Sequence, residues 1–246
     1  MRAAVYAWLA IGCGGPVASP AGGSVILSFD GHTTFSWATF WDDGPEVTPD
    51  SWADFGPCHV LTASGSATSN PILTAGTVTI TGGMQPVTLM PGNNGYYPFG
   101  QGTIGRLWNG GEVLTMSATG DPKGVPAFSG TVVAPTHITL VAPVFTNGNV
   151  DVPRDQPFHL AWTGGTVGTI WFNMSGPIPD GPSDTYCEFP AAAGEATISQ
   201  DLIGQLPAGW ASVHVAQVNR AIVPAGRFPI ELRVAESVTD GVLNFR

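Results

Sequence analysis

Short apolar runs separated by Gly, Pro and Asn dominate the pattern along this chain. Many of them alternate apolar and polar positions, as in Thr33–Phe40 and Gly76–Thr81. A period of two with abundant Val and Thr predicts half-buried strands, whereas helices need apolar positions three and four residues apart. The pattern therefore predicts an all-β protein.

The predicted strands fall into two successive sets. The first set covers 25–29, 33–40, 59–64, 76–81, 84–90, 113–118 and 128–133. The second covers 137–142, 158–163, 169–174, 195–199, 211–218 and 228–234, with one helical turn at 201–206. Such spacing is typical of antiparallel sandwiches. We predict two antiparallel β-sandwich domains, 24–135 and 136–246, with a boundary near Pro135–Thr136.

Trp162 gives the second set a more specific character. It follows Leu160 in a predicted strand and precedes Gly164 and Gly165. A large ring at such a position fills the space between the two sheets of an immunoglobulin-like sandwich. The domain 136–246 is therefore predicted to be immunoglobulin-like.

The first residues have the layout of an export signal. Arg2 supplies one positive charge, 3–11 is mostly apolar, and Cys13 follows the small residue Gly12. This order predicts a lipoprotein signal peptide in 1–13, with Cys13 as the acylated residue and 14–23 as a flexible tether. A simple signal peptide cleaved near Ala18, which releases a secreted protein, is the alternative. Both place the main body outside the cytoplasm, and acylation makes the membrane a partner through the lipid anchor.

The charge of the chain excludes one class of partner. The formal net charge is −10, with 8 Lys and Arg against 18 Asp and Glu. Nucleic-acid binding needs a cationic surface, so no nucleic-acid partner is expected. An acidic surface also keeps an exported protein soluble.

Three cysteines leave two after lipidation of Cys13. Cys58 and Cys187 could form a disulfide in an oxidising compartment. The slightly favoured alternative is that both are buried free thiols that pack as small apolar residues. The sequence leaves both alternatives open.

No motif of catalysis or metal binding occurs. The chain lacks the Gly-x-Ser-x-Gly pentapeptide, and no His or Cys pair has zinc-ligand spacing. The five histidines are isolated, at His32, His59, His137, His159 and His214. We therefore predict no enzymatic activity, no metal and no cofactor.

An acidic segment at 42–56 allows three interpretations. It contains Asp42, Asp43, Asp50 and Asp54 beside two tryptophans. Carboxylates so placed could form a solvated loop, a calcium site or the acid and base of a sugar hydrolase. The solvated loop is favoured, because the ligand order of the familiar calcium-binding loop is missing.

Aromatic residues gather in or beside the predicted loops of the first half. They are Trp41, Trp52, Tyr96, Tyr97, Phe99 and Trp108. Exposed rings of this kind can stack on the apolar faces of sugars. Buried rings would instead fix the loops to the ends of the sandwich, which is the favoured interpretation.

Several short segments of the sequence stand out: Gly76–Ile80, Val125–Val132, Val152–Arg154, Leu160–Gly165 and Cys187–Pro190 with Ala193–Gly194. They resemble segments in a group of uncharacterised proteins of myxobacteria and related soil bacteria. Members of that group look like all-β lipoproteins. The resemblance implies the same all-β fold and the same extracytoplasmic, lipid-anchored location for this chain, and it implies no activity.

These observations predict a non-enzymatic, extracytoplasmic, lipid-anchored interaction or structural protein of the cell envelope. Its partner would be an unidentified protein or glycan. The alternative is a carbohydrate-binding protein that uses the aromatic loops of the N-terminal domain.

Overall fold

The computed structural model describes residues 21–42, 51–62, 71–97, 102–178 and 181–246. The predicted signal peptide, Cys13, Phe99 and most of the acidic segment lie outside these ranges. The described chain is all-β, as predicted from the alternation of apolar and polar residues.

The strands of the first half of the chain are β1 Gly22–Phe29, β2 Thr33–Trp41, β3 Ser51–Phe55, β4 Cys58–Thr62, β5 Ile72–Leu73, β6 Val78–Thr81, β7 Val87–Leu89, β8 Thr103–Ile104, β9 Val113–Ala118 and β10 Phe128–Val133. Those of the second half are β11 Ile138–Ala142, β12 Asn149–Val152, β13 Phe158–Gly164, β14 Thr169–Ile178, β15 Gly181–Pro190, β16 Glu195–Ile198, β17 Gly209–Ala225 and β18 Phe228–Phe245. A 3-10 turn, Ala191–Ala193, and a short helix, α1 Gln200–Gln205, complete the described elements.

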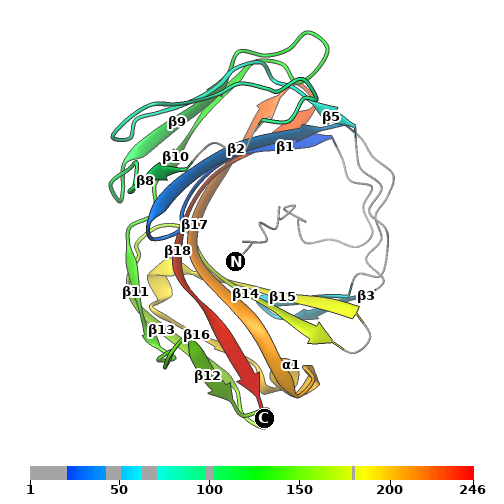
Figure 1. Ribbon diagram of the computed structural model, residues 1–246, viewed down its shortest axis with the longest axis vertical. Coiled ribbons are helices and arrows are strands. Elements are labelled where there is room, and N and C mark those ends of the chain that lie inside the picture. The colour runs from blue at the N-terminus through cyan, green and yellow to red at the C-terminus, as the bar shows by residue number, and fades with distance from the viewer. Residues whose placement is uncertain (1–20, 43–50, 63–70, 98–101, 179–180) are drawn as a thin grey trace.

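One large sheet organises the molecule. It has 11 strands, in the order β3-β4-β15-β14-β17-β18-β1-β2-β5, with β12 paired to β18 and β8 to β2. The sheet bends into a C in Figure 1, and two smaller sheets lie outside the curve. They are the four-stranded sheet β10-β9-β6-β7 and the three-stranded sheet β11-β13-β16. The inner, concave face of the C points away from both.

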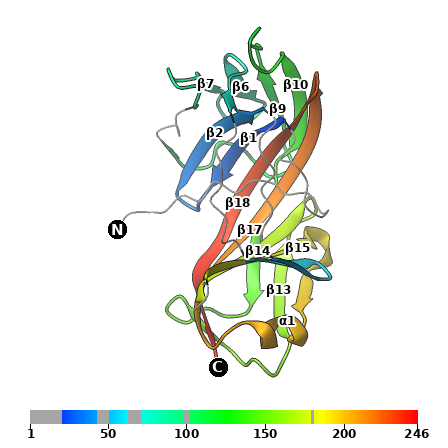
Figure 2. The ribbon, with the colours of Figure 1, turned by 90° about the vertical axis from the view of Figure 1, so that its right-hand side faces the viewer.

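The hairpin of β17 and β18 connects the two halves of the large sheet. Its strands have 17 and 18 residues and pair from Gly209–Phe245 to Ala225–Phe228, with an irregularity beside Val215. Figure 2 shows both strands crossing the whole molecule. One part of the hairpin faces the four-stranded sheet and the other faces the three-stranded sheet.

Two hydrophobic cores lie between the large sheet and the smaller ones. The first includes Phe40, Trp108, Met116 and Leu232. The second includes Trp162, Phe172, Ile198, Leu202 and Leu243. Burial of apolar surface at about 25 cal/mol per Å² makes these residues the main source of stability.

The cores do not follow the predicted division at Pro135–Thr136. Ile230 and Leu232, from beyond that point, lie in the first core, whereas Cys58 lies in the second. The prediction assumed that each domain uses consecutive strands, but β1 pairs with the distant β18, in which Val25 is opposite Leu232. This pair and the β12–β18 pair are parallel, unlike the otherwise antiparallel ladders.

Trp162 occupies the place that its position predicts. The ring is buried in the second core, and its Nε1 donates a hydrogen bond to the carbonyl oxygen of Ala191 at 2.7 Å. The immunoglobulin-like character of this half stays a prediction, because the core also takes strands from the first half of the chain.

Strand β1 begins inside the predicted tether of 14–23. Ala21 is buried and Gly22 and Gly23 already belong to the strand. A Cβ atom on Gly23 would lie 2.2 Å from Cδ1 of Phe40, so only glycine lets this ring lie against the backbone. The glycines that resembled a flexible linker therefore serve close packing.

The predicted helical turn is α1, which buries Leu202 and Ile203. Its first turn is capped by Ser199, whose hydroxyl accepts a hydrogen bond from Leu202 N at 3.3 Å. Within the described ranges, no helix has the length and apolar character needed to cross a bilayer.

Candidate functional site

The concave face of the large sheet carries the most distinctive polar chemistry of the molecule. Successive side chains of a strand point to opposite faces. Phe172, Cys187 and Val215 point into the second core, so their neighbours in the same strands face the concave side.

Cross-strand pairing aligns six polar residues on this face, one from each of six adjacent strands. They are Asp54 on β3, His59 on β4, Tyr186 on β15, Asn173 on β14, His214 on β17 and Asp240 on β18. Residues directly opposite each other share a face. We refer to these six residues as the polar row. With strands about 4.8 Å apart, the row extends for about 24 Å.

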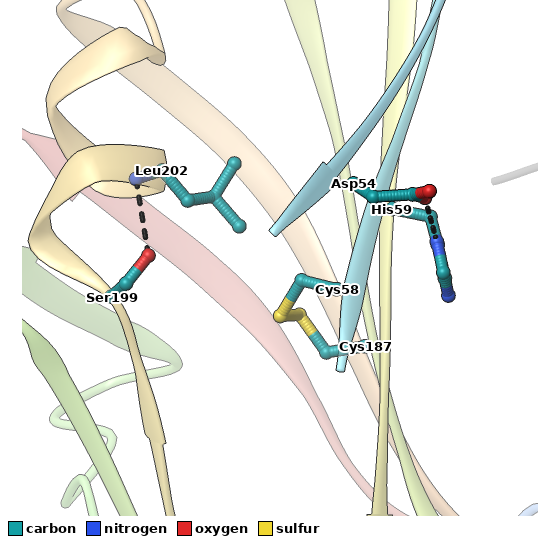
Figure 3. Close-up of a disulfide and its surroundings, with 6 residues drawn as sticks. All are labelled: Asp54, Cys58, His59, Cys187, Ser199 and Leu202. Atoms are coloured by element: carbon teal, nitrogen blue, oxygen red, sulfur yellow. Dashed lines mark hydrogen bonds and ion pairs between the residues drawn. A yellow bond between two sulfur atoms is a disulfide. The ribbon is translucent and has the colours of Figure 1, made fainter. Parts of the chain in front are cut away.

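Each end of the polar row is a pair of histidine and aspartate. Nδ1 of His59 lies 2.6 Å from Oδ1 of Asp54, and Nδ1 of His214 lies 2.5 Å from Oδ1 of Asp240. The hydrogen bond from His214 lowers the pKa of Asp240 below its ordinary value. Figure 3 shows Asp54 and His59 on the side of β3 and β4 that faces away from the disulfide and Leu202.

Beside the polar row lies an arginine–aromatic cluster. Its members are Trp171, Tyr186, Glu188, Arg220, Glu231 and Arg233. The rings of Trp171 and Tyr186 meet edge to face with centroids 5.4 Å apart. The guanidinium carbons of Arg233 and Arg220 lie 4.6 and 5.9 Å from the centroid of Trp171. Cation–π attraction and ring contact together hold the indole in place.

Each arginine of the cluster has a carboxylate partner. Nη2 of Arg220 lies 3.0 Å from both carboxylate oxygens of Glu188. Nε of Arg233 donates to Oε1 of Glu231 at 2.5 Å, and both side chains are buried. The positive and negative charges of the cluster therefore balance.

Tyr186 belongs to both the row and the cluster. Its hydroxyl donates to Oε2 of Glu188 at 2.9 Å. Burial raises the pKa of the phenol far above its ordinary value, and the charge of Glu188 adds to the shift. Tyr186 therefore stays a neutral hydrogen-bond donor at every physiological pH.

Two polar atoms of β14 lack a hydrogen-bond partner in the described part of the chain. They are Nε1 of Trp171, a donor, and Oδ1 of Asn173, an acceptor. The two residues are two positions apart and therefore share a face. A buried polar atom without a partner costs about 1–3 kcal/mol. Because both atoms are buried, a hydroxyl group of a ligand reaches them only after a covering side chain has moved.

The predicted stacking aromatics are mostly placed elsewhere. Trp108 and Tyr97 lie in the first core, so their assignment to a sugar-stacking surface is wrong. The hydroxyl of Tyr97 donates to Gly76 O at 2.7 Å and accepts from Ala75 N at 2.8 Å. For these two rings, the favoured interpretation, in which aromatic side chains fix the loops to the sandwich, is confirmed.

The other predicted aromatics are not assembled into a binding surface by the described contacts. Trp41 is half-buried at the end of β2, and Tyr96 is exposed in a turn. The backbone of Trp52 belongs to β3, but its side chain lies outside the described part of the structure, as does Phe99.

The structure joins Cys58 and Cys187 in a disulfide, so the slightly favoured interpretation of two free thiols is wrong. The residues are opposite each other on β4 and β15, and both are buried in the second core. Figure 3 shows the sulfurs pointing toward Leu202 of α1.

The acidic segment 42–56 is not a loop along its whole length, because its last part forms strand β3. Asp54 lies in β3 and contributes to the polar row, and Asp42 pairs with Arg227. Asp43 and Asp50 lie outside the described residues. Where the structure describes the chain, no three His, Cys, Asp or Glu side chains group as metal ligands.

The remaining histidines have structural surroundings. Nδ1 of His137 lies 2.7 Å from Oε1 of Glu236, a buried carboxylate that also pairs with Arg106. Nε2 of His159 lies 4.0 Å from Oε2 of Glu195. His32 is exposed in the turn after β1. None of these three joins the polar row.

Sequence reasoning missed the arginine–aromatic cluster, although one signal was present. Glu231 and Arg233 alternate with Ile230, Leu232 and Val234 in a predicted strand. Charged residues on one face of a buried strand indicate a partnered polar surface. The partners themselves come from β14, β15 and β17, which only the three-dimensional structure brings together.

Comparisons with known proteins give no guide to the function of this site. No protein-family model matches the chain, and no curated protein matches its sequence.

Proposed function

We propose that this chain is a non-enzymatic, extracytoplasmic interaction protein of the cell envelope, anchored through Cys13, and that the concave face of its large sheet contacts the ligand. The observation that carries the proposal is the concentration of paired ions, imidazoles and aromatic rings on the sheet face opposite both cores. Side chains fixed by mutual contacts lose little freedom on binding, which favours affinity.

The disulfide supports the extracytoplasmic part of the proposal. Disulfides such as Cys58–Cys187 form and persist in oxidising compartments and are rare in the cytosol. The small residue before Cys13 and the apolar run of 3–11 agree with export and acylation. An acyl chain would hold the protein at a membrane surface without a spanning helix.

The spacing of the carboxylates supports binding rather than hydrolysis. Asp54 and Asp240 stand at opposite ends of the polar row, with four strands between theirs and a separation of about 24 Å along the sheet. Glycosidases need their two carboxyl groups about 5–9.5 Å apart. The exposed acidic residues of the row are therefore too distant to act as an acid and base on one bond.

Mass spectrometry of the mature protein from its native host tests the proposal. We expect an acylated Cys13 as the first residue, and digestion of the protein when proteinase is added to intact cells or spheroplasts. A mature chain that keeps Met1, stays protected inside the cell and has reduced Cys58 and Cys187 would refute the proposal.

Carbohydrate binding is the second candidate, and one observation favours it. Trp171 and Tyr186 stand next to hydrogen-bonding groups on the concave face rather than in the predicted loops. Sugars combine apolar C–H faces with many hydroxyl groups and so suit aromatic rings that are surrounded by polar side chains.

A further inference from the structure

We propose that the concave face binds a neutral, extended polysaccharide, which lies across the strands along the polar row and contacts Trp171 and Tyr186. This inference rests on the proposed function, because it takes the concave face as the ligand-binding surface. It adds the chemical class, the orientation and the contact residues of the ligand.

The charge pattern favours a neutral ligand. Arg220 and Arg233 already pair with Glu188 and Glu231, and His214 pairs with Asp240. A polyanion would have to separate these pairs and would meet the carboxylates at both ends of the row. A neutral chain of hydroxyl groups can bind while His214 stays paired with Asp240 and Arg233 with Glu231, and only the exposed Arg220 has to move.

His214 and Asp240 provide hydrogen-bonding groups for hydroxyls. The carboxylate of Asp240 is 71% exposed and contacts His214 through Oδ1. Ionised carboxylates form the stronger class of hydrogen bond with hydroxyl donors. When neutral His214 donates from Nδ1 to Asp240, its Nε2 is fixed as an acceptor. In that state the pair offers two acceptors to hydroxyl groups, Nε2 of His214 and Oδ2 of Asp240.

The centre of the polar row and the adjoining arginine–aromatic cluster supply the complementary groups. Trp171 has the unpartnered donor Nε1, and Asn173 has the unpartnered acceptor Oδ1. The side chain of Arg220, 43% exposed, lies over the indole of Trp171. A ligand reaches this indole by displacing the long Arg220 side chain, while Arg233 continues to support the ring.

The length of the row favours a chain over a single sugar. Its members come from six adjacent strands and extend for about 24 Å. A monosaccharide would contact only one or two of these residues. A polymer that crosses the strands can contact the acceptors of the row and the rings of the cluster at once.

Affinity electrophoresis of the full, oxidised chain tests this inference. The gels contain dextran, laminarin, xylan or galactomannan, with alginate as the anionic comparison. We expect at least one neutral polysaccharide to retard the protein, with little change at high salt. Asp240→Ala should weaken that binding about tenfold, the change expected from about 1.4 kcal/mol of lost interaction.

A matched control separates the concave face from the rest of the protein. His159→Ala removes an exposed imidazole on β13, in a sheet on the other side of the molecule, and should leave the retardation unchanged. Asp240→Asn preserves the shape of the side chain and should also weaken binding, which guards against loss of folding in Asp240→Ala.

Three results would overturn the inference: no retardation by any neutral polysaccharide, salt-sensitive retardation by alginate alone, or an equal loss in His159→Ala. If Cys13 is acylated while these results are obtained, the proposed function survives and only the ligand class fails. If Cys13 is unmodified in a cytoplasmic protein that binds a neutral glycan, the proposed extracytoplasmic location is refuted and the proposed ligand class is supported.

Discussion

Cys58 of β4 and Cys187 of β15 lie directly opposite each other, with their Cα atoms 4.0 Å apart and their sulfurs bonded. The two residues are 129 positions apart in the sequence. The bond therefore attaches the β3–β4 hairpin, which carries one end of the polar row, to the strands of the second core.

Replacing both cysteines by alanine should lower the free energy of unfolding by about 2–5 kcal/mol, because the bond restricts the unfolded chain. Urea denaturation of the oxidised proteins measures the difference. A reducing agent should destabilise the natural protein to a similar degree and leave the double variant unchanged. Equal stability of the two oxidised proteins would contradict the prediction.

Gly23→Ala should destabilise the protein by about 1–3 kcal/mol, because the new Cβ overlaps the ring of Phe40. Thermal and urea unfolding measure the loss. Gly204→Ala is the matched control: the Cβ would have its nearest neighbour at 3.5 Å, and alanine favours helix α1 by about 0.5–1 kcal/mol. The prediction fails if both alanines have the same effect.

Tyr97→Phe should cost about 1–3 kcal/mol, because it leaves Gly76 O and Ala75 N without their hydroxyl partner. The exposed Tyr96 provides the comparison, and Tyr96→Phe should change stability by less than about 0.5 kcal/mol. Chemical denaturation of both variants tests whether the aromatic corner is structural. Equal stability of Tyr97→Phe and the natural protein would contradict a stabilising role for these two hydrogen bonds.

The raised pKa of Tyr186 predicts a loss of stability in alkali. The folded state holds the phenol proton more tightly than the unfolded state does, because the phenol is buried near Glu188. The contribution is complete below the unfolded pKa of about 10 and is lost as the pH rises above it. Tyr186→Phe should flatten this decline.

Absorbance titration of the phenols checks the same shift directly. Burial also raises the pKa of Tyr97, so two of the 4 tyrosines should ionise late. Four phenols that ionise together near pH 10 in the folded protein would contradict the burial of Tyr186.

Local alternation was enough to predict most strands of the fold. In β2, Thr34, Ser36, Ala38 and Phe40 are buried while the residues between them are only half-buried, as a period of two requires. The longest strands were predicted too short, because Arg220 and Glu236 resemble strand ends. Both continue in the sheet because each charge has a partner, Glu188 for Arg220 and Arg106 for Glu236.

The candidate site could not be read from the sequence for a related reason. The polar row runs from Asp54 to Asp240 across strands whose order in the sheet is not their order in the chain. Its alignment depends on the register of five separate ladders, and a shift of one residue in any ladder would break it. Sequence periodicity gives the face of each residue within its own strand but not its neighbours.

The hairpin of β17 and β18 has a consequence for biogenesis. The ribosome makes these strands after every other described strand, yet both cores need them. Neither core can therefore be completed before both of these strands have been synthesised. The two halves thus depend on one shared event, the arrival of the β17–β18 hairpin, and should acquire resistance to proteases together rather than one after the other.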